Sequence, residues 1–135
     1  WDMQNPAELL APRNMDSQSQ AAPILVVEDE PLIALDIEDS LVALGMPVHV
    51  ARSLADARRL VARLPLPRLV LLDVVLPDGR SFDFAHELIA LGVPLVFLTG
   101  YDHGIPDSLR HVTVMEKPFS TDGLIAVVTR TAVPR

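Results

Sequence analysis

Short apolar runs alternate with amphipathic segments from residue 24 onward. Five runs have the length and apolar character of buried β-strands, and they lie at 24–27, 48–51, 69–72, 95–98 and 112–115. The fifth run has polar neighbours, which is typical of a strand at the edge of a sheet. Strict alternation of strands and helices predicts an α/β protein with one doubly wound, five-stranded parallel sheet and helices on both faces.

Helix starts can be placed from residues that favour the first helical turn. Pro31 suits a first-turn position, Ser53 with Asp56 forms a capping-box-like start, and Ser81 and Ser120 are further candidate caps. The segment between the fourth and fifth strands contains Gly104 and Pro106, which predicts a short or degraded fourth helix. For the helix after Ser81 the spacing predicts an inward face of Phe82, Ala85, Leu88 and Ile89.

Residues 1–23 differ from the rest of the chain, because they are rich in Gln, Asn, Pro, Ser and Ala without a sustained period. We interpret them as a tail or linker with one possible short helix at 5–10, and residues 24–135 as the folded domain. The chain has 11 basic and 18 acidic residues, a formal charge of −7, which argues against duplex DNA and anionic membranes as partners. It has no cysteine, which excludes disulfide and thiolate sites, and no apolar run of membrane-spanning length, so a soluble, cytoplasmic protein is expected.

Polar residues follow four of the predicted strands where each strand ends. In a parallel sheet these ends converge on one crevice, so we expect a shared pocket for Glu28, Asp29, Asp73, Thr99 and Lys117. Three clustered carboxylates repel each other, and a hard cation such as Mg²⁺ relieves that repulsion. The chain's only lysine adds a positive charge. A carboxylate can attack phosphorus and form an acyl phosphate, and Asp73 is the best nucleophile because it stands alone after a central strand.

Four sequence segments resemble signature segments of the receiver domain of two-component response regulators. They are ILVVEDEP at 24–31, LLDVVLPDG at 71–79, FLTG at 97–100 and EKPF at 116–119. The resemblance covers residues 24–135 and implies a flavodoxin-like fold with strand order 2-1-3-4-5.

The resemblance also implies roles for individual residues. Asp73 would be the phospho-acceptor, Thr99 and Lys117 would contact the phosphoryl group, and the Lys117–Pro118 peptide bond would be cis. The implied Mg²⁺ ligands are Glu28, Asp29, Asp73 and the backbone carbonyl of Val75. Leu32 with Pro118 and Phe119 would form an apolar patch near the place where a histidine-bearing helical bundle docks.

Two departures from the usual receiver pattern concern the output face. Receivers usually carry an aromatic residue three positions before the lysine, whereas this chain has Val114 there, and Thr99 and Lys117 are only 18 positions apart. The segment FLTGY at 97–101 resembles the F-x-T-G-Y type of receiver, found as single-domain regulators or in hybrid kinases, often beside HWE-type histidine kinases. In that type Tyr101 is a candidate switch residue, and covering the pocket is its alternative role.

These observations predict a signalling domain that accepts a phosphoryl group from a histidine kinase or histidine phosphotransfer protein onto Asp73 with Mg²⁺. It would catalyse only its own phosphorylation and dephosphorylation, and would signal to a downstream protein partner. One alternative is a non-phosphorylated interaction module with the same fold. A less favoured alternative is a Mg²⁺-dependent aspartyl-phosphate phosphohydrolase of the haloacid dehalogenase type, which requires a second aspartate at the position of Val75. Whether the chain is a stand-alone regulator or the C-terminal receiver of a hybrid kinase stays open.

Overall fold

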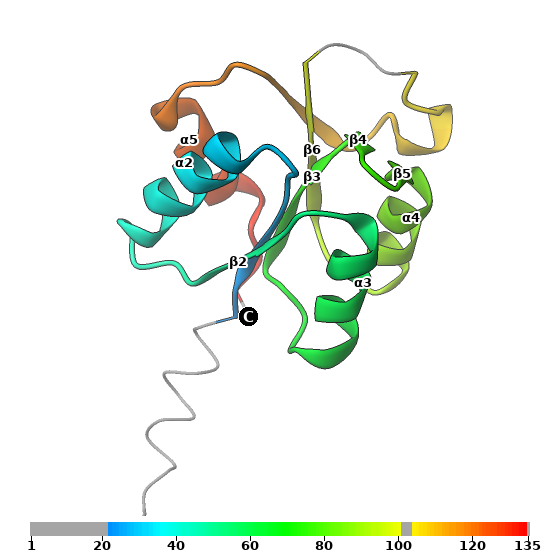
Figure 1. The fold of residues 1–135 in the computed structure, drawn as a ribbon, viewed down its shortest axis with the longest axis horizontal. Helices are drawn as coiled ribbons and strands as arrows, with labels where there is room; N and C mark the ends of the chain where they lie inside the picture. The colour runs from blue at the N-terminus through cyan, green and yellow to red at the C-terminus, as the bar shows by residue number, and fades with distance from the viewer. Residues whose placement is uncertain (1–21, 101–103, 135) are drawn as a thin grey trace, which may run out of the picture.

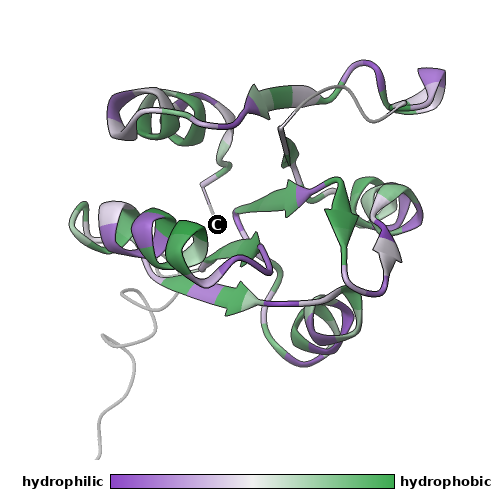
Figure 2. Cartoon of the chain, turned by 45° about the horizontal axis from the view of Figure 1, so that its top comes forward, coloured by the Kyte–Doolittle hydropathy of each residue, from purple (hydrophilic) through white to green (hydrophobic). Residues whose placement is uncertain are grey.

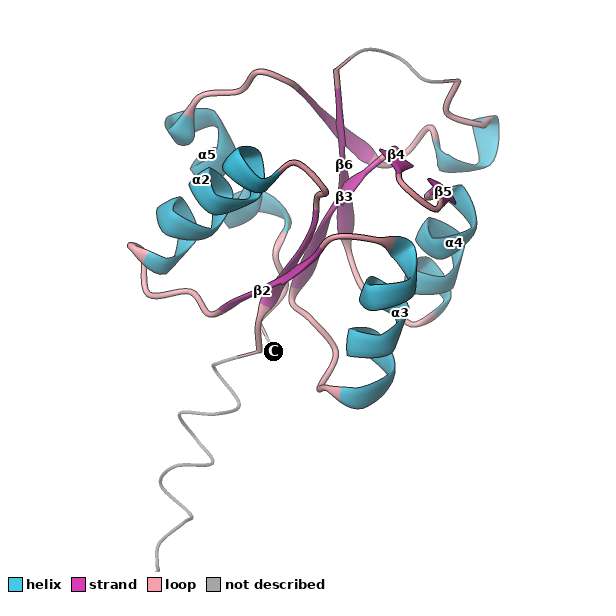
Figure 3. Cartoon of the chain, in the orientation of Figure 1, coloured by secondary structure: helices cyan, strands magenta, loops and turns pink. Residues whose placement is uncertain are grey.

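A five-stranded parallel sheet in the order β2-β1-β3-β6-β7 forms the centre of the computed structural model, which describes residues 22–100 and 104–134 (Figures 1 and 3). Its strands are β1 (Ile24–Val27), β2 (Val48–Ala51), β3 (Leu69–Asp73), β6 (Leu95–Thr99) and β7 (Thr113–Glu116). The predicted fold class and strand order are confirmed, although the last strand begins one residue later than predicted. The predicted N-terminal helix at 5–10 and Tyr101 lie outside the described residues.

Helices cover both faces of the sheet. Figure 1 shows α2 (Pro31–Val42) and α5 (Thr121–Thr131) on one side, and α3 (Leu54–Arg63) and α4 (Phe82–Ala90) on the other. Because both faces of the central strands β1, β3 and β6 are buried, these strands are almost continuously hydrophobic instead of alternating (Figure 2). None of these four described helices is long and apolar enough to cross a membrane.

The apolar side chains form one buried layer on each face. Alternate residues of a strand point to opposite faces, so Val26 packs with Ile37 of α2 and Val128 of α5. Its neighbour Val27 belongs to the other layer, together with residues of α3 and α4 such as Leu54, Phe84, Ala85 and Leu88.

The starts of three helices agree with prediction, and that of α4 does not. Pro31 occupies the first turn of α2. The Ser53 hydroxyl accepts a hydrogen bond from the amide of Asp56 at 3.1 Å, and the Ser120 hydroxyl accepts one from Gly123 at 3.0 Å. Ser81 precedes α4 but makes no side-chain cap bond; its hydroxyl donates instead to the carbonyl of Asp73 at 2.6 Å. The predicted inward face is also partly wrong, because Phe84 is buried while Ile89 is 39% exposed.

The connections on either side of α4 differ from a regular βα repeat. A small antiparallel hairpin of β4 (Val75–Leu76) and β5 (Gly79–Arg80) precedes α4. Gly79 has a φ of 133°, a conformation that favours glycine at the end of the hairpin turn. Between β6 and β7, the only helical segment among the described residues is a single 3₁₀ turn, Asp107–Leu109. The prediction of a degraded fourth helix is therefore confirmed for the described part of this connection.

Candidate functional site

The carboxyl ends of the strands bring the predicted site residues to one edge of the sheet. Glu28 and Asp29 follow β1, and Asp73 ends the neighbouring strand β3. Thr99 ends β6, which pairs with β3 on its other side. Lys117 follows β7, and its amide donates a hydrogen bond to the carbonyl of Thr99 at 2.8 Å. Backbone pairing alone therefore places these residues around a common point.

The three acidic side chains converge closely enough to share a cation. Glu28, Asp29 and Asp73 each offer a carboxylate oxygen, and these oxygens lie within 4.8 Å of one another. Glu28 is fully buried at 0% exposure and Asp73 is 4% exposed, whereas Asp29 is the most accessible of the three. One Glu28 oxygen accepts a hydrogen bond from the amide of Glu30 at 3.0 Å, which orients the carboxylate. This is a mixed buried and accessible cluster of hard oxygen donors.

Lys117 reaches both buried carboxylates. Its Nζ lies 2.6 Å from Glu28 Oε1 and 2.9 Å from Asp73 Oδ1. These two buried oxygens meet the ammonium at ion-pair distance, without the angles of a well-formed hydrogen bond. Burial lowers the pKa of Lys117, but the carboxylates of Glu28 and Asp73 outweigh it, so the pKa is raised overall. The lysine is therefore held as a cation beside the candidate nucleophile.

The environment of Asp73 disfavours its charged form. Burial and, next, the neighbouring Glu28 carboxylate raise the pKa of Asp73, Lys117 lowers it, and the net result is a pKa of about 8. One ammonium therefore does not fully compensate two carboxylates in this pocket. Additional positive charge at the same place would favour the ionised, nucleophilic carboxylate.

The donors fit a divalent cation such as Mg²⁺, which prefers a few carboxylates together with carbonyl and water oxygens. The backbone of β4 offers a carbonyl as well. Residues opposite each other in an antiparallel pair alternate between hydrogen-bonded and non-bonded types. Since the Ser81 amide donates to the Val74 carbonyl at 3.0 Å, the adjacent Val75–Arg80 pair is of the non-bonded type. The hydrogen bonds of the hairpin therefore do not involve the Val75 carbonyl. The predicted role of this carbonyl as a metal ligand requires that.

Two residues near the site were not identified from the sequence. Ser81 was interpreted as a helix cap, yet its fully buried hydroxyl bonds the backbone of Asp73. Arg52 donates from Nη2 to the carbonyl of Asp29 at 3.4 Å, across the β1 and β2 strand ends. The position of Ser81 eight residues after the candidate nucleophile was visible in the sequence, but only the hairpin between them brings the two together.

A groove opens beside Lys117 at the start of α2. It has a volume of about 550 Å³ and is lined by Leu32, Ile33, Asp36, Lys117, Pro118 and Phe119. Leu32 is 77% exposed and lines the groove together with Pro118 and Phe119, so the exposed apolar surface is shared by neighbouring residues. The Lys117–Pro118 peptide bond is cis, as predicted. The apolar patch predicted around Leu32, Pro118 and Phe119 is therefore a groove that borders the acidic pocket.

The chain is similar in sequence to curated regulatory proteins of bacteria. The chain is 35% identical over 115 residues to the Phyllosphere-induced regulator PhyR of Methylorubrum extorquens, covering 82% of this chain and 43% of that protein. It is 31% identical over 128 residues to the probable transcriptional regulatory protein TcrX of Mycobacterium tuberculosis, covering 87% of this chain and 54% of that one. The chain thus spans about half the length of these curated relatives.

Solved structures agree with the fold. The solution structure of SdrG from Sphingomonas melonis Fr1 is 35% identical, with a TM-score of 0.69 over 82% of this chain and 95% of that one. The chemotaxis response regulator CheY4 of Vibrio cholerae, at 20% identity and a TM-score of 0.71 over 81% of this chain and 97% of that one, shares the fold. The model of the response regulator receiver domain matches residues 24–129. The chain therefore belongs to the response regulator receiver domain family.

Proposed function

We propose that this receiver domain takes a phosphoryl group from a phosphohistidine onto Asp73 in a Mg²⁺-dependent reaction. The observation that carries the proposal is the meeting of Glu28, Asp29 and Asp73 with Lys117 at one edge of the sheet. Formally, three carboxylates, one divalent cation and one ammonium sum to −3 + 2 + 1 = 0. A neutral pocket does not repel an incoming phosphoryl group, and such transfer depends mainly on positioning and charge compensation.

In the proposed reaction, an oxygen of the Asp73 carboxylate attacks phosphorus. The new O–P bond forms as the P–N bond to the imidazole breaks, and the imidazole nitrogen keeps the electron pair and takes up a proton. Lys117 and the hydroxyl of Thr99 contact the phosphoryl oxygens in this scheme, and Thr99 is buried at the end of the strand next to Asp73. Water later attacks the phosphorus of the acyl phosphate, the O–P bond to Asp73 breaks, and inorganic phosphate leaves as the carboxylate is restored.

The metal would be held by Glu28, Asp29 and Asp73, with the Val75 carbonyl as a fourth protein ligand. When bound, Mg²⁺ supplies positive charge to phosphoryl oxygens and favours the ionised form of Asp73. The fit rests on the oxygen-only donor set and on the Val75 carbonyl, which the β4–β5 hairpin ladder does not use. Water molecules would complete the coordination, as is usual for this cation.

The proposed donor is a histidine kinase or a histidine phosphotransfer protein that docks in the groove beside Lys117. The groove joins exposed apolar surface at Leu32 to the reactive pocket. The output is proposed to be contact with a downstream protein, with residues 24–135 as the receiver unit and 1–23 as a tail or linker. The proposal also includes a cytoplasmic location and a role for Tyr101 as a switch residue. It is compatible with a stand-alone regulator and with the receiver of a hybrid kinase.

The test is phosphorylation by a small donor such as acetyl phosphate or phosphoramidate, followed by intact-mass spectrometry. We expect a gain of one phosphoryl group that needs Mg²⁺, disappears in Asp73→Asn and persists in Asp107→Asn, a fully exposed carboxylate elsewhere. No gain in the wild type, or a gain that survives Asp73→Asn, would contradict the proposal and favour a non-phosphorylated interaction module. Multiple turnovers on varied phosphomonoesters would favour a phosphohydrolase.

A further inference from the structure

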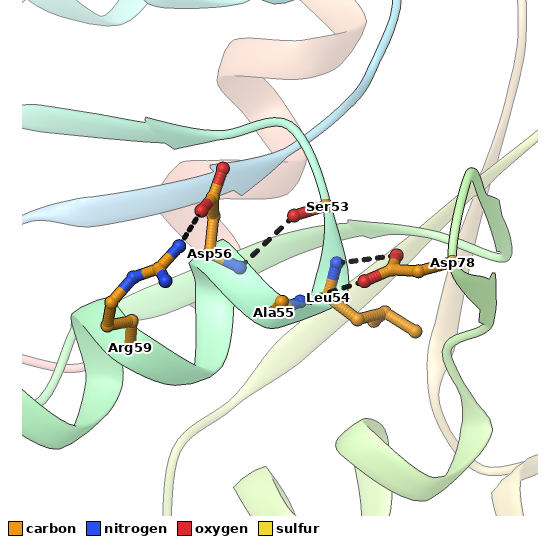
Figure 4. A network of polar contacts seen from close by, with 6 residues as sticks. All are labelled: Ser53, Leu54, Ala55, Asp56, Arg59 and Asp78. Atoms are coloured by element: carbon orange, nitrogen blue, oxygen red, sulfur yellow. Dashed lines mark hydrogen bonds and ion pairs between the residues drawn. The ribbon is translucent and has the colours of Figure 1, made fainter.

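Asp78, in the turn of the β4–β5 hairpin, joins that hairpin to the start of α3. Its Oδ1 accepts a hydrogen bond from the amide of Leu54 at 2.9 Å, and its Oδ2 accepts one from the amide of Ala55 at 3.0 Å (Figure 4). The first amides of a helix have no partner within the helix. These two hydrogen bonds lower the pKa of Asp78, so the side chain is a carboxylate at neutral pH, and its charge suits a helix N-terminus.

The helix does not need Asp78 for its local cap. Ser53 already accepts a hydrogen bond from the amide of Asp56, as Figure 4 also shows. Asp78 comes from a different loop, 24 positions beyond Leu54 and 23 beyond Ala55 in the chain. Its two hydrogen bonds therefore fix the position of one element relative to another, which the bond within the Ser53 turn does not.

The β4–β5 hairpin, which Asp78 connects to α3, contains Val75 and begins two residues after Asp73. Asp73 and Val75 precede Asp78 in the same loop, and Ser81 closes that loop by donating to the Asp73 carbonyl. One end of the hairpin is thus anchored on the nucleophile strand, and its turn is anchored on α3. Just before α3, Arg52 donates to the carbonyl of Asp29. The start of α3 therefore contacts both loops that carry proposed metal ligands.

We propose that Asp78 is a positioning residue for the metal. By tying the hairpin turn to α3, it holds the backbone carbonyl of Val75 at the distance from Asp29 and Asp73 that a small cation requires. This inference rests on the proposed function, since it concerns the affinity of the same site for Mg²⁺. Groups that orient metal ligands typically change metal affinity by about 10- to 100-fold when they are removed.

The test compares Asp78→Ala with Ser53→Ala, which removes a cap from the same helix without touching the hairpin. Calorimetric titration with MgCl₂ gives the affinity, and thermal unfolding without metal gives the stability of each variant. We expect Asp78→Ala to weaken Mg²⁺ binding by about tenfold or more, and Ser53→Ala to leave it within about twofold of wild type. Both should lower the melting temperature, because each removes a cap.

Asp78→Asn serves as the conservative variant and as the substitute if Asp78→Ala does not fold. Its amide oxygen can accept one of the two hydrogen bonds, so an intermediate loss of Mg²⁺ affinity is expected. Saturating Mg²⁺ should restore the rate of phosphorylation by acetyl phosphate in both variants, because the nucleophile is unchanged.

The outcomes separate this inference from the proposed function. If the wild type binds Mg²⁺ and the affinities of the Asp78 variants stay within twofold of the wild-type affinity, the positioning role is wrong. If Ser53→Ala weakens binding as much as Asp78→Ala, the effect belongs to helix stability and the positioning role is again wrong. If the wild type binds no Mg²⁺, the proposed function itself fails, and the role of Asp78 fails with it.

Discussion

Lys117 Nζ lies 2.9 Å from Asp73 Oδ1 and at the same time 2.6 Å from Glu28 Oε1, so one ammonium faces two buried carboxylates. Removing one partner from such a buried arrangement leaves uncompensated charge, which is costly. Without a metal, two carboxylates face one ammonium, and burial together with the Glu28 carboxylate raises the pKa of Asp73. The dependence of metal binding and of stability on pH should reflect this imbalance.

Mg²⁺ binding should weaken as the pH falls below about 8. The raised pKa of Asp73 means that a proton competes with the metal for the carboxylate over this range. For one competing proton, we expect the apparent affinity to fall by up to about tenfold per pH unit. Calorimetric titrations at several pH values, with buffers of different ionisation enthalpy, should also detect proton release. A pH-independent affinity from pH 6 to 8 would contradict the prediction, and the slope should be lost in Asp73→Asn.

The contribution of Asp73 to the stability of the metal-free protein should fall as the pH rises from about 4 to about 8. The pKa of Asp73 is raised from 3.8 to about 8 in the folded state, so the folded state binds a proton more tightly than the unfolded chain does. That contribution is fully present below the unfolded pKa and is lost as the pH passes through the folded pKa. Urea unfolding of the wild type and of Asp73→Asn at each pH measures it, since the difference between the two should change across this window. Saturating Mg²⁺ should reduce the loss, and an unchanged difference would argue against a raised pKa.

Ser81→Ala should destabilise the protein by about 1–3 kcal/mol, because a buried carbonyl loses its hydrogen-bond donor. The Ser81 hydroxyl is fully buried and donates to the Asp73 carbonyl at 2.6 Å. Ser40→Ala is the matched control, since the Ser40 hydroxyl also donates to a backbone carbonyl, at 2.8 Å, but from an exposed position. The control should change the free energy of unfolding by less than about 0.5 kcal/mol. If chemical denaturation gives the same change in the free energy of unfolding for both substitutions, burial of the hydrogen bond is not what makes Ser81 important for stability.

Leu32→Asp should slow phosphoryl transfer from a phosphohistidine protein but leave phosphorylation by acetyl phosphate unchanged. Leu32 is 77% exposed at the rim of the groove beside Lys117, so a charge there would disturb docking and not folding. We expect kcat/KM with the protein donor to fall by about tenfold or more, as for a residue at the centre of an interface. Leu91→Asp is the control, because Leu91 is 50% exposed after α4 on the opposite face of the sheet. An equal loss of phosphorylation rate with the protein donor and with acetyl phosphate would mean that the substitution disturbs the acidic pocket and not docking in the groove.

Local patterns in the sequence were sufficient to predict the arrangement of the strands and the positions of the polar residues that follow them. Short apolar runs such as Ile24–Val27 suit a strand buried on both faces, and parallel order follows from the helices between the runs. Because the carboxyl ends of parallel strands share an edge, the meeting of Asp73 with Glu28 and Lys117 was predictable without coordinates. The degraded helix before β7 was predictable because Gly104 and Pro106 disfavour helix.

Spacing along a helix was less informative for α4. Two patterns of apolar residues compete there, and the one that contains Phe84 is buried because its ring meets the layer formed by β3 and β6. Ile89, which fits the same helical period from Phe82, is 39% exposed. Which pattern is buried depends on the register of the helix on the sheet, a property that only packing decides.

The sequence by itself determined the sheet, the edge at which the site lies and the residue types that meet there, since these depend on periodicity and on the ends of parallel strands. Only the tertiary structure decided the roles of Ser81 and Asp78. Both side chains carry ordinary turn and cap chemistry, and either could have bonded the backbone beside it. The hairpin instead places Ser81 against Asp73 and Asp78 against the amides of Leu54 and Ala55. Such hydrogen bonds join segments that are distant in the chain, and folding must first bring those segments together.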